Sequence, residues 1–174
     1  MSQPLAYFIT FSTYGAWLHG REIGSVDKQH NVVGTPFLPP DAEKEIAMRG
    51  NMREPPYLLD KPKREIVLRT ILEVAAHRGW TILACHVRTT HAHVIVAAST
   101  KPEKVMSDFK AYASRRLKEQ LNEPADRKRW TQHGSTLYLW NEQDVAEKID
   151  YVLRRQGTPM AVYDGANASS EPEA

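Results

Sequence analysis

The order of predicted elements indicates an α+β fold of the ferredoxin-like type, with one antiparallel sheet and two helices on one of its faces. Runs of β-forming residues and amphipathic helical stripes follow each other as strand, helix, strand, strand, helix, strand, and an extra helix follows. Only two residues separate the middle strands, so those strands form an antiparallel hairpin. The βαββαβ order is most economically satisfied by a single sheet that leaves its second face to the last helix.

The first strand is predicted over residues 5–12, where aromatic and β-branched side chains alternate with smaller or polar ones. From 13 to 60 the chain carries many glycines and prolines, which exclude long regular elements. We interpret 13–60 as an insertion loop, with one helical patch at 41–50. A segment of this length without regular structure is typical of a functional or mobile loop.

A helix is predicted over residues 61–79, with Asp60 as its N-cap, Pro62 in its first turn and Gly79 at its end. The two hairpin strands follow at 80–88 and 91–98.

The second helix is predicted over 102–122, followed by a basic linker at 123–131 and a short strand at 135–140. Asn141 is placed to cap a final helix that runs through Gln156. We expect one domain over residues 1–163, and we expect residues 164–174 to form a disordered tail.

Composition excludes several classes of protein. The 174 residues are 41% hydrophobic and 25% charged, which suits one globular domain. The lone cysteine, Cys85, excludes internal disulfides and a zinc ribbon, and it favours a reducing, cytoplasmic setting. The chain has no run of about 18 apolar residues and no leader pattern at its start, so we expect neither a membrane span nor export. A net charge of +2 is too small to indicate nucleic-acid binding by itself.

Two histidines begin the strand at 91–98. Because side chains alternate along a strand, His91 and His93 share one face while Ala92, Val94 and Val96 share the other. The apolar set belongs against the two helices, so the histidines face the open side. They are there either as a pair of metal ligands or as two separately solvated side chains.

Tyr151 is the strongest candidate nucleophile among the seven tyrosines. On the last helix it lies about 100° from Val152, off the apolar stripe and beside Lys148 and Arg155. A tyrosine with only a packing role is expected on the stripe, as Tyr112 is in the second helix.

These features together resemble the single-tyrosine HUH transposases, especially the REP-associated tyrosine transposase branch. The resemblance is carried by His91-Ala92-His93 on a strand, the run FKAYASRRL on the next helix and Asp150-Tyr151-Val152 on the last one. The segments FITFSTYGAWLHG, HVRTTHAHVIV and HGSTLYLWNE also look like that family, so the likeness extends over nearly all of residues 5–163.

The resemblance implies an endonuclease and strand transferase acting on single-stranded DNA that carries hairpins. It implies that His91 and His93 bind Mg²⁺ or Mn²⁺ and that Tyr151 attacks the scissile phosphate, which gives a 5′-phosphotyrosine and a free 3′-hydroxyl. Relatives usually place Gln or Asn four residues after the tyrosine as a third ligand. Here that position is Arg155, and Gln156 follows at the fifth, so it reaches the metal only if the helix end is distorted before Gly157.

Candidate DNA contacts are basic residues in the second helix, its linker and the last helix. They are Lys110, Arg115, Arg116, Lys118, Arg127, Lys128, Arg129, Lys148 and Arg155. A solvated helix face explains such a charge run equally well. Trp17, Trp130, Tyr138 and Trp140 are candidates for base stacking, with core packing as the alternative.

Other functions stay open at this stage. The main alternative is a DNA-hairpin-binding protein that keeps the fold and has lost efficient chemistry, as the shifted amide would suggest. A histidine-triad nucleotide hydrolase is disfavoured because the third alternating position is Ile95. Relatives include monomers and homodimers that supply the tyrosine in trans, and no apolar stripe here decides between them.

Overall fold

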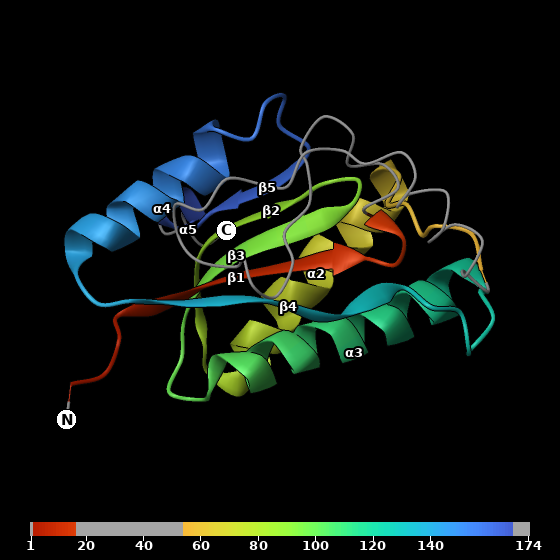
Figure 1. Cartoon of the computed structure of the whole chain (residues 1–174), viewed down its shortest axis with the longest axis horizontal. Coiled ribbons are helices and arrows are strands. Elements are labelled where there is room, and N and C mark those ends of the chain that lie inside the picture. Colours follow the sequence, from red (N-terminus) through yellow and green to blue (C-terminus); the bar gives the residue numbers. More distant parts are fainter. Residues whose placement is uncertain (1, 17–53, 169–174) are drawn as a thin grey trace, which may run out of the picture.

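Strand β1 (Ala6–Thr13) lies within a five-stranded sheet in the computed structural model, which describes residues 2–16 and 54–168 (Figure 1). The remaining elements are α2 (Lys61–Arg78), β2 (Thr81–Val87), β3 (His91–Ala97), α3 (Pro102–Leu121), β4 (Trp130–Leu139), α4 (Glu142–Arg154), β5 (Ala161–Asp164) and α5 (Gly165–Ala168). Within these described ranges, no helix is both long enough and apolar enough to cross a membrane.

The sheet order is β4-β1-β3-β2-β5, and every neighbouring pair is antiparallel. Its first four strands have the order expected of a ferredoxin-like βαββαβ unit, so the predicted α+β fold class is confirmed. The pairing of β1 with β3 sets Thr10 opposite His93, and the pairing of β2 with β3 sets His86 opposite the same histidine. Three strands therefore place polar side chains at one level of the sheet.

The predicted N-caps of α2 and α4 and the predicted end of α2 are confirmed, whereas α4 ends at Arg154, two residues before the predicted Gln156. The Asp60 side chain accepts a hydrogen bond from the Lys63 N–H at 3.1 Å, and Gly79 ends α2 in the left-handed conformation with φ of 75°. Asn141 caps α4 by accepting from the Asp144 N–H at 2.8 Å. Such caps contribute about 1 kcal/mol each.

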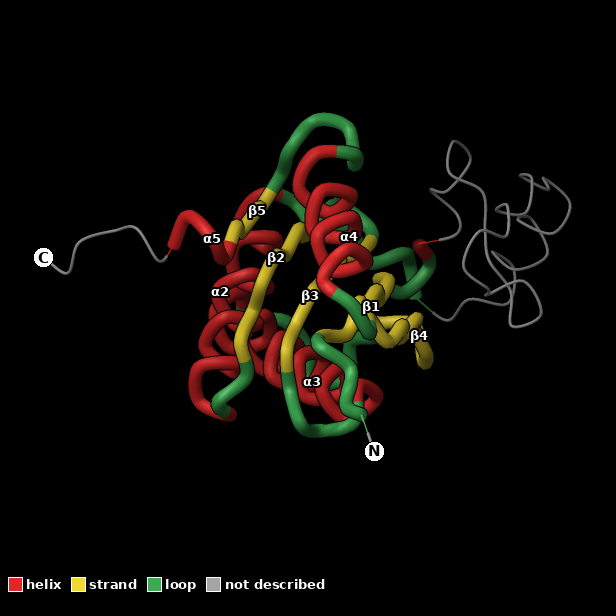
Figure 2. Tube along the Cα trace, turned by 90° about the vertical axis from the view of Figure 1, so that its left-hand side faces the viewer, coloured by secondary structure: helices red, strands yellow, loops and turns green. Residues whose placement is uncertain are grey.

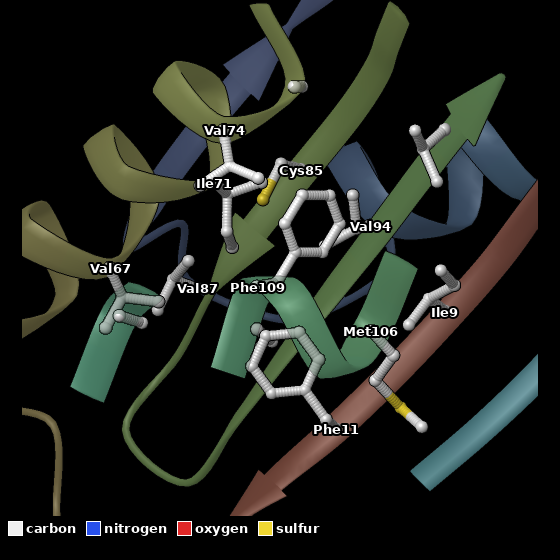
Figure 3. Packing of buried hydrophobic residues seen from close by; sticks show 14 of the residues in the cluster. Ile9, Phe11, Val67, Ile71, Val74, Cys85, Val87, Val94, Met106 and Phe109 are labelled. Carbon is white, nitrogen blue, oxygen red and sulfur yellow. The ribbon is translucent and has the colours of Figure 1, made fainter. Parts of the chain in front are cut away.

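The sheet has two unequal cores. Helices α2 and α3 cover one face, while α4 lies on the other (Figure 2). Val94 on β3 packs into the larger core with Phe109 of α3 and Ile71 of α2 (Figure 3). Ile95 points to the opposite face and packs with Val152 of α4 in the smaller core. The histidine face is thus opposite the two-helix face, as the alternation predicts.

Strand β4 is longer than the predicted 135–140. It begins at Trp130, inside the segment assigned to a basic linker, because Trp130 pairs with Thr13 past an irregularity in β1. It ends at Leu139, so Trp140 lies outside the strand.

The expected disordered tail is wrong for residues 164–168. Strand β5 adds to the free edge of β2, with Asp164 opposite Ala84, and α5 follows directly. Gly165 approaches the sheet so closely that an added Cβ would lie 2.7 Å from the Ile82 carbonyl oxygen. Residues 169–174 lie outside the described residues.

Most of the predicted 13–60 insertion, including the helical patch at 41–50, lies outside the described residues. Its last part is fixed to the sheet: Tyr57 N–H donates to the Tyr14 carbonyl and Leu59 N–H to the Thr89 carbonyl, both at 2.8 Å. Tyr57 and Leu59 are both buried. The segment that contains Tyr57 and Leu59 therefore covers this end of the sheet on the side of α2 and α3.

Candidate active site

His91 and His93 lie side by side on the α4 face of β3. Their ring centroids are 4.7 Å apart, with the ring planes 71° to each other. His93 is buried, at 7% exposure, and His91 is partly buried at the start of the strand. The two rings are thus close enough for both to bind one metal ion.

Two threonine hydroxyls contact the Nδ1 atoms of these rings. Thr10 Oγ1 lies 2.8 Å from His93 Nδ1, and Thr90 Oγ1 lies 3.2 Å from His91 Nδ1. A hydroxyl that accepts the Nδ1 proton fixes the neutral tautomer whose Nε2 carries the free electron pair. Sequence reasoning missed Thr10, because only the register of β1 against β3 brings it to His93.

Tyr151 reaches this pair from α4. Its ring centroid is 5.9 Å from that of His93 and 6.1 Å from that of Phe8, in edge-on geometry with both. Lys148, one turn earlier on α4, holds its ammonium 5.6 Å from the Tyr151 ring centroid. The predicted neighbourhood of tyrosine, histidine and lysine is therefore present within one chain.

Arg155, the second cation expected beside the tyrosine, is engaged elsewhere. Its Nε donates to Asp150 at 3.0 Å, and Arg154 donates to the other oxygen of the same carboxylate at 3.1 Å. The three side chains form an exposed cluster in which Asp150 compensates part of the arginine charge.

Gln156 joins the histidines because the helix ends before it. Residue Arg155 has already left helical geometry, with φ of −113° and ψ of 19°, and Gly157 adopts a φ of 74°. The distortion that Gln156 needs is thus present. Its carboxamide Nε2 donates to the Tyr151 carbonyl at 3.5 Å, and the amide lies near enough to His91 and His93 to raise the pKa of both rings against the larger effect of burial.

His86 holds this arrangement in place from β2. Its Nδ1 donates to the Val152 carbonyl at 3.1 Å, and its Nε2 accepts from the Met160 N–H at 3.0 Å. Both ring nitrogens are therefore used in fixing the chain on either side of Gln156. Although His86 faces the same side as His93, it is a positioning residue and not a third imidazole ligand.

Burial lowers the pKa of all three histidines. Desolvation is the largest cause in each case, and it takes the pKa of His91 to about 4 and that of His93 well below its usual value. The nearby Arg88 charge lowers the pKa of His91 further. The rings are consequently neutral at pH 7, the state that an imidazole needs in order to bind a metal.

These shifts predict that the metal-free protein loses stability in mild acid. Imidazoles with a depressed folded pKa stay neutral in the fold while the unfolded chain takes up protons below about pH 6.5. The free energy of unfolding should therefore be constant above pH 7 and fall as the pH drops from 6.5 towards 4. Urea unfolding in EDTA at several pH values measures this. A free energy that stays level or rises through that interval contradicts the shifts.

The donor set fits a divalent cation with open coordination positions. In the described part of the chain no group of three or more His, Cys, Asp or Glu side chains is placed to hold a metal ion, so a third ligand has to come from another residue type. Two imidazoles with their Nδ1 atoms occupied and one carboxamide make three neutral donors, which leave room for oxygen atoms of a substrate. Imidazole ligands favour Mn²⁺ over Mg²⁺ at such a site.

The basic residues assigned to DNA binding are divided by the sheet. Lys110, Arg115, Arg116 and Lys118 belong to α3, which lies on the opposite face of the sheet from α4 (Figure 2), the helix that carries Tyr151. Lys110 donates to the carbonyls of Thr131 and His133, and Arg116 pairs with Glu73. The α3 set therefore does not adjoin the candidate site.

The linker arginines hold the chain together. Arg129 is 4% exposed and donates from Nε to Glu123 at 3.0 Å, so its assignment to DNA binding is wrong. Arg127 donates to Glu54 at 3.0 Å. Glu123 also accepts from the Tyr57 hydroxyl, which ties this linker to the segment before α2. Buried charges need such partners, and the sequence alone does not reveal which cations have them.

The candidate stacking residues also separate. Trp130 is partly buried and donates from Nε1 to Ser114 at 2.9 Å, so it belongs to the packing of α3. Tyr138 and Trp140 are 49% and 52% exposed, with ring centroids 5.8 Å apart. Trp17 lies outside the described residues. Cys85 is buried in the larger core, as its strand position predicts.

A protein-family model described as transposase, IS200-like, matches residues 46–148. One similar solved structure is a REP-associated tyrosine transposase bound to a REP hairpin, with 12% identity and a TM-score of 0.47. That match covers 86% of this chain, which spans 65% of the other. Another, from Deinococcus radiodurans R1 and described provisionally as a transposase, has 15% identity, a TM-score of 0.45 and coverage of 91% and 95%. No curated protein matches.

Proposed function

Because the chain belongs to the IS200-like transposase family, we propose that it cleaves and rejoins single-stranded DNA through a covalent bond between DNA and Tyr151. The observation that supports this most directly is the meeting of Tyr151, His91, His93 and Gln156 on one face of the sheet. These groups come from β3, from α4 and from the turn after it.

In the proposed reaction, the Tyr151 oxygen forms a bond to the scissile phosphorus while the bond from phosphorus to the 3′-oxygen breaks. The phenol proton leaves, and the 3′-oxygen takes up a proton to become a hydroxyl. The phosphodiester energy is kept in the 5′-phosphotyrosine, so a 3′-hydroxyl can later attack it and rejoin the strand. The Lys148 ammonium, 5.6 Å from the Tyr151 ring centroid, places a positive charge beside the proposed nucleophile.

His91, His93 and Gln156 are the residues proposed to hold a divalent ion, Mg²⁺ or Mn²⁺. When bound, that ion would polarise a phosphoryl oxygen and stabilise its developing charge. Thr10 and Thr90 keep the imidazoles oriented, and His86 holds the chain that carries Val152 and Met160. The protein thus supplies a preformed set of donors, which costs little reorganisation during the reaction.

We propose hairpin-bearing single-stranded DNA as the substrate and the cytoplasm as the place of action, following the family resemblance. Tyr151 lies 5.9 Å from His93 of its own chain, measured between ring centroids, which supports a site assembled in cis.

The test uses labelled single-stranded DNA from the genomic flanks of the coding sequence, incubated with the protein and either Mn²⁺ or EDTA. A denaturing gel should show a protein–DNA band only with Mn²⁺. If the DNA is retained on a native gel and no covalent band forms in any metal, the protein is instead a hairpin-binding relative without chemistry. The shifted amide favours that alternative, while the placement of Gln156 near both imidazoles favours the proposed chemistry.

The threonine contact gives a separate prediction for metal affinity. Replacing Thr10 with Val removes the hydroxyl beside His93 Nδ1 and keeps the shape of the side chain, so Mn²⁺ should bind about tenfold more weakly. Calorimetric titration measures this, with Thr136→Val on β4 as the control. Thr10→Ser should restore most of the affinity. Equal affinities for all variants would show that Thr10 does not orient His93.

A further inference from the structure

Arg88 lies beside the candidate site without having been assigned to it. It follows β2 directly, and its Nη1 donates to the Thr158 carbonyl at 2.9 Å. The same atom is 3.4 Å from His86 Nε2, and a Cβ added to Gly157 would lie 3.9 Å from Nη2. The guanidinium therefore sits against the turn that carries Gln156, on the histidine side of the sheet.

The charge of Arg88 is not compensated by a carboxylate in the described residues. The described ion pairs engage Arg78, Arg116, Arg127, Arg129, Arg154 and Arg155, each with an acidic partner. Arg88 is partly buried, and the charge near it on the two-helix side is another cation, Arg64. A partly desolvated cation beside neutral imidazoles and a second arginine provides a strongly positive position.

We propose that Arg88 binds the scissile phosphate of the single-stranded DNA, through its Nη2 edge beside Gly157. The proposal rests on the proposed function, because it takes Tyr151 and the histidines as the place where that phosphate lies. A phosphodiester supplies the anion that this guanidinium lacks, and charge-assisted bonds from arginine to phosphate are among the strongest that a protein forms.

The backbone around Arg88 suits this role. Gly157 has a φ of 74°, so a side chain is disfavoured there and the space next to Nη2 stays open. The bond from Nη1 to the Thr158 carbonyl fixes the plane of the guanidinium, so little side-chain freedom remains to be lost when an anion binds. Arg88 thus links the turn that presents Gln156 to the proposed phosphate position.

The test is a double comparison in the Tyr151→Phe background, in which the DNA stays uncleaved. Arg88→Met and the control Arg69→Met, an exposed residue of α2 on the opposite face of the sheet, are titrated with flanking single-stranded DNA. A second oligonucleotide carries a neutral methylphosphonate in place of the phosphate at which the wild-type protein cleaves. Arg88→Met should bind the ordinary DNA about tenfold to a hundredfold more weakly, with little loss for Arg69→Met. Both should bind the methylphosphonate DNA equally.

An arginine that only holds the turn gives a different pattern. The affinity of Arg88→Met would then fall by the same factor for the ordinary DNA and for the methylphosphonate DNA, and this result would overturn the proposal. An affinity for ordinary DNA equal to that of the wild type would overturn it too. Arg88→Lys keeps the positive charge but loses the two-pronged hydrogen-bonding geometry of the guanidinium, so its affinity for the ordinary DNA should be intermediate. Mn²⁺ titration of Arg88→Met, expected to match wild type or exceed it, checks that the histidine site is intact.

The outcome is distinguishable from failure of the proposed function. If wild-type protein forms no covalent adduct, the strand-transfer proposal fails whatever Arg88 does. If wild type and Arg88→Met form the adduct at the same rate, the strand-transfer proposal stands and Arg88 is not a phosphate ligand.

Discussion

Replacing Tyr151 with Phe should abolish the covalent protein–DNA band while leaving the fold and the binding of DNA intact. The variant lacks the only oxygen that the proposed reaction joins to phosphorus, so the rate should fall by at least about a thousandfold. In the described residues the Tyr151 hydroxyl has no hydrogen-bond partner, and the ring keeps its contacts with His93 and Phe8. The free energy of unfolding should therefore change by less than about 0.5 kcal/mol.

Tyr138→Phe is the matched control for this experiment. Tyr138 is 49% exposed on β4, and its ring stands at the end of the sheet near Tyr7 and Trp140. Its variant should form the adduct at the wild-type rate. A band that survives in Tyr151→Phe would identify a different nucleophile, and it would remove the main support for the proposed role of α4.

Replacing His91 and His93 together with Gln should remove metal binding and, with it, formation of the adduct. Because these two imidazoles supply two of the three proposed ligands, Mn²⁺ affinity should fall by more than about a hundredfold. The same double variant should flatten the loss of stability below pH 6.5, since His86 alone then remains of the three buried imidazoles.

His133→Gln serves as the control for the histidine pair. His133 lies exposed on β4, and only its backbone carbonyl is used, by Lys110 and Thr131. Calorimetry with Mn²⁺ measures the affinity of each variant. Retention of tight Mn²⁺ binding in the double histidine variant would show that the metal is held elsewhere.

Strand alternation made the histidine pair predictable. The apolar set Ala92, Val94 and Val96 identifies the core face of β3, and this leaves His91 and His93 on the face of the last helix. The helical period placed Tyr151 off the apolar stripe, but its ring is partly buried and packs against the smaller core with Ile149. The histidine prediction depends only on local geometry along one strand, whereas the surroundings of Tyr151 depend on how α4 packs on the sheet.

The contacts across strands and loops were not accessible in the same way. Thr10 meets His93 only through the register of β1, and Arg88 meets the turn after α4 only through tertiary packing. Arg129 looked like a surface cation because its burial depends on Glu123 and Tyr57 closing over it. A sequence shows that a charge is present and does not show its counter-ion.

Strand β5 was missed for a related reason. Its four residues are too short to give a clear period, and they form a strand because the edge of β2 is free to pair with them. The predicted boundary between residues 163 and 164 falls inside β5, and α5 follows it directly.

The two cores differ in size, and the parts of the candidate site that they support should differ in stability. The large core under α2 and α3 fixes the histidine strand, whereas the tyrosine lies on one short helix above a small core and the amide lies on the turn that follows this helix. Local opening of α4 exposes far less apolar surface than global unfolding does. Substitutions beneath α4 will therefore disturb the alignment of nucleophile and ligand before they reduce the melting temperature.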